Sequence, residues 1–340
     1  MKIVFFENIS WVKILLLILV MVFTLNSIFV PYYFNLENIL ALSQSYIELG
    51  VLGFAVILLL ISGNIDISIA GIVAFSATIF ALCFSFGLPI PVCIILTLIT
   101  GTLCGLINAL IIVGFNIPSI IVTLATMSVF RGLSYVMLKD NAIYGFPKSF
   151  TYFGTGYIPG TYVPLELIVF PILMIITWFI LHISTFGKKI YSVGLNPEAS
   201  FRSGISVRLV NIIVFSWAGF LYSLAAILLI SRIGSVRPNI ATGYELEIIA
   251  TVVFGGTAIF GGYGNVWGYV LAFLTLVSMR SGLALLNVPG QYMAIIFGLV
   301  LIFSILANNV INDRNERKAL DCLLYTSDAA DDTPCVDLGG

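Results

Sequence analysis

Charge is scarce in this chain. Only 9% of its 340 residues are Asp, Glu, Lys or Arg, whereas 60% belong to the hydrophobic set, and the mean hydropathy is +1.12. A soluble globular domain carries about 25% charged residues, so a water-soluble protein of this composition would expose most of its apolar side chains. The composition therefore excludes a cytosolic enzyme and a secreted disulfide scaffold, and it indicates a protein whose solvent is the lipid bilayer.

Residues that support catalysis, metal binding or nucleic-acid binding are also few. The formal net charge is −1 and no run of basic residues exceeds two, so the sequence lacks the electrostatic footprint of a nucleic-acid-binding protein. The single histidine, His182, ends an apolar run, and the five cysteines have neither metal-site spacing nor the even number of a disulfide framework. We therefore expect no catalytic residue, no metal site and no cofactor in this chain.

A phosphate-binding loop is missing as well. The motif Gly-x4-Gly-Lys-Ser/Thr occurs nowhere in the sequence, and Gly187-Lys188-Lys189 lacks its remaining residues. If ATP drives a process in which this chain takes part, a separate polypeptide must bind that ATP.

Long apolar runs dominate what is present. A helix needs about 20 mostly apolar residues to cross about 30 Å of hydrocarbon. Ten runs approach this length: Trp11–Val30, Tyr46–Ile61, Ile67–Phe86, Pro91–Val113, Pro118–Leu138, Pro164–His182, Leu209–Ser231, Tyr244–Phe260, Val266–Leu285 and Pro289–Ala307. The sequence therefore predicts an all-α integral membrane protein with about ten transmembrane helices, the first of them an uncleaved span.

The distribution of Lys and Arg sets the expected orientation, because cytoplasmic loops of membrane proteins are enriched in these residues. With both termini in the cytoplasm, nine basic residues fall inside and four fall outside. The inside set is Lys2, Lys13, Lys188, Lys189, Arg202, Arg208, Arg314, Arg317 and Lys318, and the outside set is Lys139, Lys148, Arg232 and Arg237. The predicted topology is N-in and C-in, which agrees with an even number of spans.

The spans also suggest an internal repeat and a domain plan. Asn116-Ile117-Pro118 opens the fifth span and Asn287-Val288-Pro289 opens the tenth from the opposite side, as an inverted repeat requires. We expect a transmembrane domain over residues 1–310, a cytoplasmic loop over 184–208 within it, and a cytoplasmic tail over 311–340. Residues 321–340 hold five Asp and no Lys or Arg, and we interpret them as a non-native reading frame or a disordered acidic tail.

Several polar residues interrupt the apolar runs, although a charged group near the bilayer centre costs at least about 2.5–3.5 kcal/mol. The candidates for a transport pathway or a structural polar role are Glu48, Asn64, Asp66, Arg131, Glu245, Glu247 and Arg280. We expect Asp66 or Asn64 to cap the helix that follows, with a pathway role as the alternative. Glu245 and Glu247 suit either the outer interface or contact with a solute, and the two arginines can pair with these acids.

The inside loop carries the signals of a short helix. Asn196 suits the cap position, Pro197 the first helical position, Glu198 the positive end of the helix and Gly204 its termination. This helix of about two turns is either a connector or a docking element for a cytosolic partner. In the second case the coupling residues are Asn196, Pro197, Glu198, Ala199, Arg202 and Gly204.

Residues 242–250 (Thr-Gly-Tyr-Glu-Leu-Glu-Ile-Ile-Ala), with Gly255-Gly256 and Gly261-Gly262 after them, resemble the permease subunits of carbohydrate ABC importers. This is the ribose, xylose, rhamnose and autoinducer-2 group of the branched-chain amino acid permease superfamily. Residues 65–68 (Ile-Asp-Ile-Ser) are similar to its Ile-Asp-Leu-Ser signature, and residues 186–205 to its cytoplasmic coupling segment. The likeness covers about residues 40–308.

Two departures leave the solute open. Asn64 and Ala70 stand where many members have Gly; Asn64 is closer to the autoinducer-2 branch, and residues 232–239 are closer to the rhamnose branch. The resemblance implies a permease subunit of an ATP-driven importer for a rhamnose-type or autoinducer-2-like solute, with ribose or xylose possible, in the bacterial cytoplasmic membrane. It implies as partners two ABC ATPase subunits, a second permease subunit, a periplasmic or lipid-anchored substrate-binding protein and membrane lipid, with no nucleic acid.

Two other functions remain open from the residues alone. An ion-coupled secondary transporter would use Asp66 or Glu48 as its coupling carboxylate and would need no ATPase. A branched-chain amino acid permease would share the architecture but should place groups that pair with a zwitterion along its pathway.

Overall fold

The computed structural model describes residues 3–139 and 141–289, together with residues 292, 295, 298, 299 and 302. All elements named below lie in the unit Met1–Met293. The predicted tenth span, Pro289–Ala307, lies outside the described residues except for isolated positions, and so does the predicted tail over residues 311–340.

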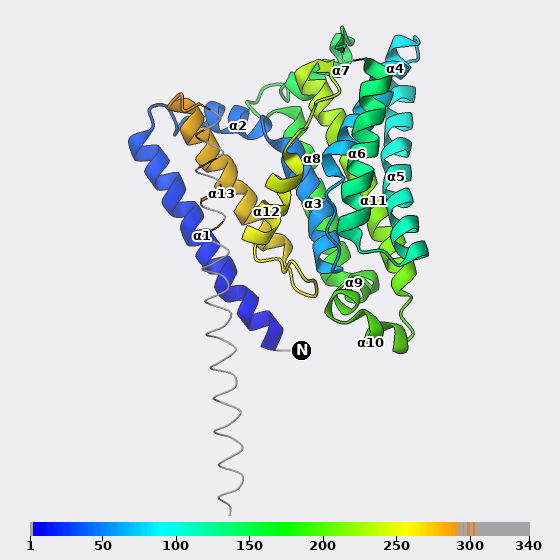
Figure 1. Ribbon diagram of the computed structural model, residues 1–340. Helices are drawn as coiled ribbons and strands as arrows, with labels where there is room; N and C mark the ends of the chain where they lie inside the picture. The colour runs from blue at the N-terminus through cyan, green and yellow to red at the C-terminus, as the bar shows by residue number, and fades with distance from the viewer. Residues whose placement is uncertain are drawn as a thin grey trace, which may run out of the picture. The chain divides into compact units, whose positions relative to one another are not determined.

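Helices account for nearly all the regular structure in the described residues, as the sequence predicts (Figure 1). The helices are α1 Ile3–Phe29, α2 Leu36–Gln44, α3 Ile47–Ile61, α4 Ile69–Ser85, α5 Ile90–Phe115, α6 Ser119–Leu138, α7 Lys148–Thr155, α8 Val169–Trp178, α9 Thr185–Leu195, α10 Pro197–Arg202, α11 Val207–Ile233, α12 Tyr244–Phe254 and α13 Val266–Leu285. A 3₁₀ turn, Leu165–Ile168, precedes α8, and a π-helical turn, Phe179–Ile183, follows it. Two short antiparallel strands, β1 Ile143–Tyr144 and β2 Ser235–Val236, pair Ile143 with Val236.

Six helical segments in the described residues are long and apolar enough to cross a membrane. They coincide with six predicted spans: Trp11–Phe29, Ile90–Phe115, Ser119–Leu138, Leu165–Ile183, Val207–Ile233 and Val266–Leu285. The second and third predicted spans form the shorter apolar helices α3 and α4. The chain is thus an all-α membrane protein with several apolar helices, and a total of ten remains a prediction.

The eighth predicted span, Tyr244–Phe260, is wrong at its end. Helix α12 stops at Phe254, because Gly255 follows and Gly256 adopts a left-handed backbone with φ 86°. An L-residue with a side chain rarely adopts this conformation, whereas glycine adopts it without steric cost. The apolar residues after Gly256 belong to the loop that leads to α13 and do not continue the helix.

The repeat predicted from two Asn-x-Pro segments has a local counterpart. Asn116 lies directly after α5, and Asn287 lies two residues after the end of α13. Both have a left-handed backbone, with φ 57° and 54°. Because the tenth span lies outside the described residues, the inverted repeat itself stays a prediction.

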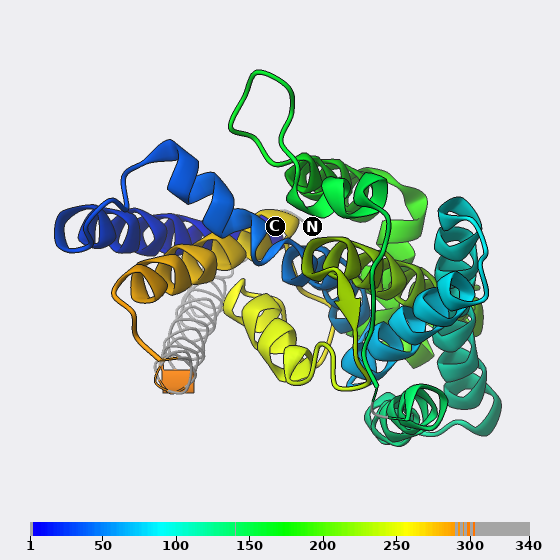
Figure 2. The same cartoon turned by 90° about the horizontal axis from the view of Figure 1, so that it is seen from above.

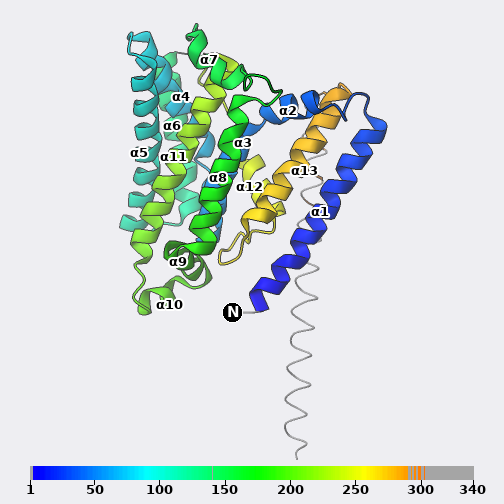
Figure 3. The ribbon, with the colours of Figure 1, turned by 180° about the vertical axis from the view of Figure 1, so that it is seen from behind.

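Helix α11 is the centre of the packing. It packs against α3, α4, α5 and α7, and its second half is buried almost throughout (Figures 1 and 3). Helix α4 packs against α5 and α6, and α1 packs along α13, as Figure 2 shows from above. We call the side of the bundle with α9 and α10 the α9–α10 end and the opposite side, with α7, the α7 end (Figure 3).

The contact between α5 and α11 is a backbone-to-backbone approach. A Cβ atom on Gly105 would collide with the carbonyl oxygen of Phe215, and one on Gly219 would collide with the carbonyl oxygen of Gly101. Small residues allow membrane helices to approach this closely, since packing rather than a hydrophobic driving force holds helices together in lipid. The Gly101-x3-Gly105 spacing on α5 therefore fixes the position of α11.

We predict that Gly105→Val destabilises the fold by about 1–3 kcal/mol, the usual cost of overpacking a closely packed contact. The measurement is the midpoint of thermal unfolding and the folded yield of the purified protein in detergent. Gly114→Val is the matched control, because Gly114 lies on the same helix and a Cβ atom there would have no neighbouring atom within 4 Å. Equal midpoints for the two variants would contradict the role assigned to Gly105.

Candidate functional site

The chain leaves helical geometry between α3 and α4, over residues 62–68. Non-helical backbone at membrane depth is tolerated only where protein or water satisfies its polar groups. Two hydroxyls from α6 do so here: Ile65 N–H donates to Ser119 Oγ at 3.1 Å, and Ile67 N–H donates to Thr123 Oγ1 at 3.1 Å. The first turns of α6 therefore hold this segment in place.

Asp66 is the centre of a buried hydrogen-bond network. Its Oδ1 accepts from the backbone N–H of Ser68 at 2.7 Å and from the Ser68 hydroxyl at 2.6 Å, and its Oδ2 accepts from the Tyr222 hydroxyl at 3.1 Å. Asn108 Nδ2 in turn donates to Ser68 Oγ at 2.8 Å. Asp66 is 3% exposed, and its network joins the segment before α4 to α5 and α11.

The expected cap of α4 is corrected by this geometry. The cap position belongs to Ser68, and neither Asn64 nor Asp66 occupies it. The Asp66 carboxylate instead accepts from the N–H two residues later, which is the reach of an Asx turn. The side chain thus shapes the approach to α4 and does not satisfy the N–H groups of its first turn.

Asn64 borders a polar cleft at the α9–α10 end. Its amide donates to Asn211 Oδ1 at 3.1 Å and to Ser62 Oγ at 3.0 Å. The cleft has a volume of about 400 Å³, and its polar lining residues are Asn64, Asn116, Ser119, Arg208 and Asn211. A space of this size falls within the range of small-molecule sites, about 300–1,000 Å³.

A second non-helical segment, residues 234–243, connects α11 with α12. Arg131 Nη1, from α6, donates to the carbonyl oxygens of Pro238 at 2.8 Å and Ile240 at 2.7 Å. Arg131 thus makes its hydrogen bonds to backbone carbonyls, and it also interacts electrostatically with Glu245, one of the acids expected to pair with it. Glu245, the acid nearest this segment on α12, is half-buried in the first turn of that helix.

Helix α6 thus supplies hydrogen-bond partners to residues 62–68 and to residues 234–243. Ser119 and Thr123 satisfy residues 62–68, and Arg131 satisfies residues 234–243. Twelve residues separate Ser119 from Arg131, which is a rise of about 18 Å at 1.5 Å per residue. A single helix therefore links two segments at different depths of the bundle.

Glu48 is paired at the α7 end of the bundle. Its Oε1 accepts from Arg232 Nη2, at the end of α11, and from the Tyr244 hydroxyl at 3.2 Å. The Glu48 side chain is 1% exposed, and a buried charge needs a partner and hydrogen bonds to be tolerated. The sequence placed Arg232 in an outer loop, and no local signal pointed to this partner.

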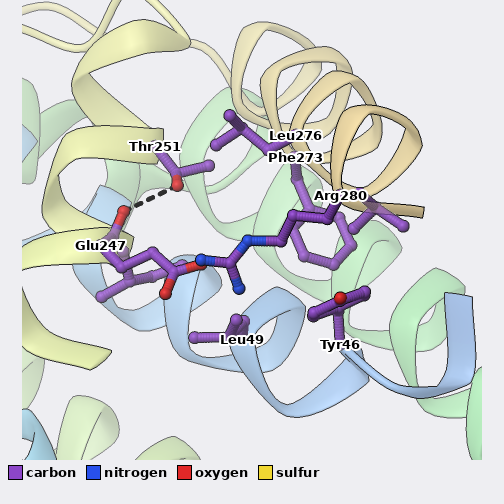
Figure 4. Close-up of a pocket in the computed structure, with 9 residues that line it drawn as sticks. Tyr46, Leu49, Glu247, Thr251, Phe273, Leu276 and Arg280 are labelled. Atoms are coloured by element: carbon purple, nitrogen blue, oxygen red, sulfur yellow. Dashed lines mark hydrogen bonds and ion pairs between the residues drawn. The ribbon is translucent and has the colours of Figure 1, made fainter. Parts of the chain in front are cut away.

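The predicted pairing of Arg280 with an acid is confirmed for Glu247. The two side chains form an ion pair at 2.5 Å between α13 and α12, and the Arg280 guanidinium lies 5.3 Å from the ring centroid of Tyr46 (Figure 4). The space that these residues enclose with Leu49, Thr251 and Phe273 is about 10 Å³. That is room for one water molecule at most, so this cluster is closed to a larger solute.

The short helix predicted in the inside loop is confirmed. Asn196 Oδ1 accepts from Ala199 N–H at 2.9 Å, Pro197 occupies the first turn of α10, and Gly204 follows with φ 83°. Glu198 and Arg202 form an exposed ion pair at 2.6 Å on α10. The sequence missed the preceding helix α9, which begins where Ser184 Oγ accepts from Gly187 N–H at 3.1 Å.

The side chains that the structure describes offer no metal centre. Within those residues no group of three or more His, Cys, Asp or Glu side chains is placed to hold a metal ion. The charged side chains of Glu48, Asp66 and Arg131 are engaged in hydrogen bonds with residues far away in the chain.

Comparison with known proteins identifies the relatives of the chain. The family described as the permease component of the branched-chain amino acid transport system matches residues 35–305. The ribose import permease protein RbsC of Bacillus subtilis (strain 168) is 36% identical over 82% of this chain and 87% of its own length. RbsC of Haemophilus influenzae is 31% identical over 91% of this chain and 94% of its own length. The autoinducer 2 import system permease protein LsrD of Escherichia coli (strain K12) is 31% identical over 85% and 88%, respectively. No solved structure matches the chain.

The two anchors on α6 generate a paired prediction. Thr123→Val removes the acceptor of Ile67 N–H, so backbone hydrogen exchange should increase in residues 64–68 and stay unchanged in residues 235–243. Arg131→Met removes the donor to Pro238 and Ile240 and should give the reverse pattern. Because each lost hydrogen bond is worth about 0.5–1.5 kcal/mol, or more to a charged donor, local exchange should rise about 2- to 20-fold. Exchange that rises equally in both segments with either variant would contradict separate anchoring.

Proposed function

Because the chain belongs to the family of permease components of the branched-chain amino acid transport system, we propose that it is the membrane permease subunit of an ATP-driven ABC importer for a sugar-like solute. It is a multi-pass protein of the bacterial inner membrane and a transport component, not an enzyme. The observation that carries the proposal is the likeness to ribose and autoinducer 2 import permeases over more than four-fifths of the chain.

We propose a small neutral, hydroxyl-rich solute. Ribose and autoinducer 2, the solutes in the names of the relatives, receive equal weight, and the rhamnose-type solute favoured by residues 232–239 has no counterpart among those relatives. The Asn-rich cleft of about 400 Å³ supports this choice, because amide and hydroxyl groups match the donors and acceptors of such a solute. The relatives do not favour a branched-chain amino acid.

The ion-coupled alternative has weak support in the geometry. Both carboxylate oxygens of Asp66 already accept hydrogen bonds from Ser68 and Tyr222, and Glu48 is paired with Arg232. A coupling carboxylate must exchange its partners with an ion during the cycle, whereas these contacts tie helices together. We therefore assign Asp66 and Glu48 structural roles within the permease.

The partners follow from the same proposal. Two ABC ATPase subunits supply the ATP hydrolysis that this sequence has no motif for, and a substrate-binding protein delivers the solute to the outer face. A second permease subunit, identical or similar, completes the membrane part, with lipid around it. We propose that the α9–α10 end faces the cytoplasm, in agreement with the basic residues of the 184–208 loop.

We propose α10 as the ATPase docking element, through Asn196, Pro197, Glu198, Ala199, Arg202 and Gly204. Its surface supports this role: Phe201 is 71% exposed and Leu195, just before α10, is 58% exposed. Large apolar side chains exposed outside the membrane mark interaction sites when they gather together. The exposed Glu198–Arg202 pair supplies charges beside them.

Reconstituted transport tests the function. Proteoliposomes that contain this chain, its cognate ATPase and its binding protein should take up labelled D-ribose or labelled autoinducer 2 with ATP inside, and vesicles without the ATPase should not. Uptake by the chain alone, driven by a proton or sodium gradient, would overturn the proposal.

A charge swap tests docking on α10. Glu198→Arg and Arg202→Glu each place a like charge in the proposed contact and should weaken ATPase binding about tenfold or more. The double variant Glu198→Arg/Arg202→Glu restores an i,i+4 ion pair within α10, worth only about 0.3–0.5 kcal/mol, but keeps the reversed charge pattern. Its ATPase binding should therefore stay weak; full recovery in the double variant would mean that the pair only stabilises α10.

A further inference from the structure

Four glycines bring three segments together at the α9–α10 end. Gly63 follows α3, Gly194 lies near the end of α9, and Gly261 and Gly262 lie in the loop between α12 and α13. We call them the glycine junction. Figure 1 shows the loop after α12 beside the end of α3 and next to α9.

The contacts in the glycine junction are backbone to backbone. Gly262 N–H donates to the carbonyl oxygen of Ile61 at 2.9 Å. A Cβ atom on Gly261 would lie 2.8 Å from the carbonyl oxygen of Gly194 and 2.8 Å from Cα of Gly63, and one on Gly194 would lie 2.6 Å from Gly262 N and would collide with the Ile61 oxygen. No space for a side chain remains between the segments at these points.

Tyr191 links α9 to the α12–α13 loop through a hydrogen bond. Its hydroxyl donates to the carbonyl oxygen of Gly264 at 2.6 Å. Burial raises the pKa of this hydroxyl above its ordinary value, so Tyr191 remains protonated and able to donate. Two independent contacts, one steric and one a hydrogen bond, thus bind α9 to the loop before α13.

The glycine junction lies between the proposed docking helix α10 on one side and residues 62–68 and the α12–α13 loop on the other. Helix α10 follows α9 after a single residue, Asn196, and residues 62–68 begin where α3 ends. A closely packed contact transmits displacement because it has no free volume to absorb it. A shift of α9 therefore acts on the segment that carries Asp66 and on the connection between α12 and α13.

From these contacts we infer that Tyr191 and Gly194 are positioning residues that transmit movement of the ATPase-docked α9–α10 pair to residues 62–68 and to the α12–α13 loop. This inference rests on the proposed function of the chain as an ATP-driven permease. Neither residue lines the polar cleft of about 400 Å³. Their role is to convert hydrolysis in the partner into opening and closing of the permease.

The test uses Tyr191→Phe, which removes the hydroxyl donor, and Gly194→Ala, which adds one methyl group to the glycine junction. Matched controls are Ser192→Ala, whose hydroxyl bonds only to Lys188 O within α9, and Gly114→Ala, which has open space. Each variant is reconstituted with the cognate ATPase and binding protein, and labelled D-ribose and labelled autoinducer 2 are both offered. The readouts are ATPase binding, ATP hydrolysis, and solute taken up per ATP hydrolysed.

We expect both junction variants to bind the ATPase and hydrolyse ATP like the unchanged chain. Solute uptake per ATP should fall about tenfold in Tyr191→Phe, the effect of one lost hydrogen bond on a coupling equilibrium, and it should also fall in Gly194→Ala, where the methyl group displaces the Ile61 carbonyl. Both controls should keep the full ratio. If Gly194→Ala fails to fold, Tyr191→Phe alone decides the outcome. Provided that the chain without substitutions transports, two outcomes overturn the inference. One is that Tyr191→Phe keeps the full ratio of solute taken up per ATP hydrolysed, and the other is that weakened ATPase binding accounts for the fall in this ratio. A failure of the unchanged chain to show ATP-dependent uptake overturns the proposed function and this inference together.

Discussion

The architecture depends on one constraint: backbone N–H and C=O groups within a membrane must find partners inside the protein. Residues 62–68 and 234–243 are two of the segments that leave helical geometry, so their backbone polar groups need partners other than those within a helix. Side chains of α6 supply partners to both segments, hydroxyls for N–H groups and a guanidinium for carbonyls. The position of α6 in the bundle is thus coupled to the conformation of each break.

Helix α11 joins the two ends of the molecule through three different kinds of contact. Near the α9–α10 end Asn211 accepts from Asn64, in the middle Tyr222 donates to Asp66, and at the α7 end Arg232 pairs with Glu48. The close approach to α5 at Gly105 and Gly219 keeps this helix from sliding. Buried polar contacts of this kind specify the register of a helix more sharply than apolar contacts, which tolerate small shifts.

Local features of the fold could be predicted from the sequence, whereas distant partners could not. The cap at Asn196 was predictable because capping depends on residues a few positions apart, and the apolar runs gave most helices within a few residues. The end of α12 was missed because the apolar run continues to Phe260 after the glycines terminate the helix. Tyr222 and Arg232 were missed as partners because they lie 156 and 184 positions from Asp66 and Glu48 in the chain, and no local pattern encodes such a pairing. The interaction of Arg131 with an acid could be anticipated, since Glu245 acts on its charge. Its hydrogen bonds to the carbonyl oxygens of Pro238 and Ile240 could not, because they depend on the course of the chain between α11 and α12.

The bond between Tyr222 and Asp66 also has a consequence for biogenesis. Synthesis at about 5–20 residues per second separates the emergence of these two residues, 156 positions apart, by about 8 to 30 s. During that interval the first half of the bundle has left the ribosome, and Asp66 Oδ2 has not yet met the hydroxyl from which it accepts in the folded chain. The hydrogen bond that joins residues 62–68 to α11 can form only after the second half of the chain has begun to emerge, so the network around Asp66 is completed late in biogenesis.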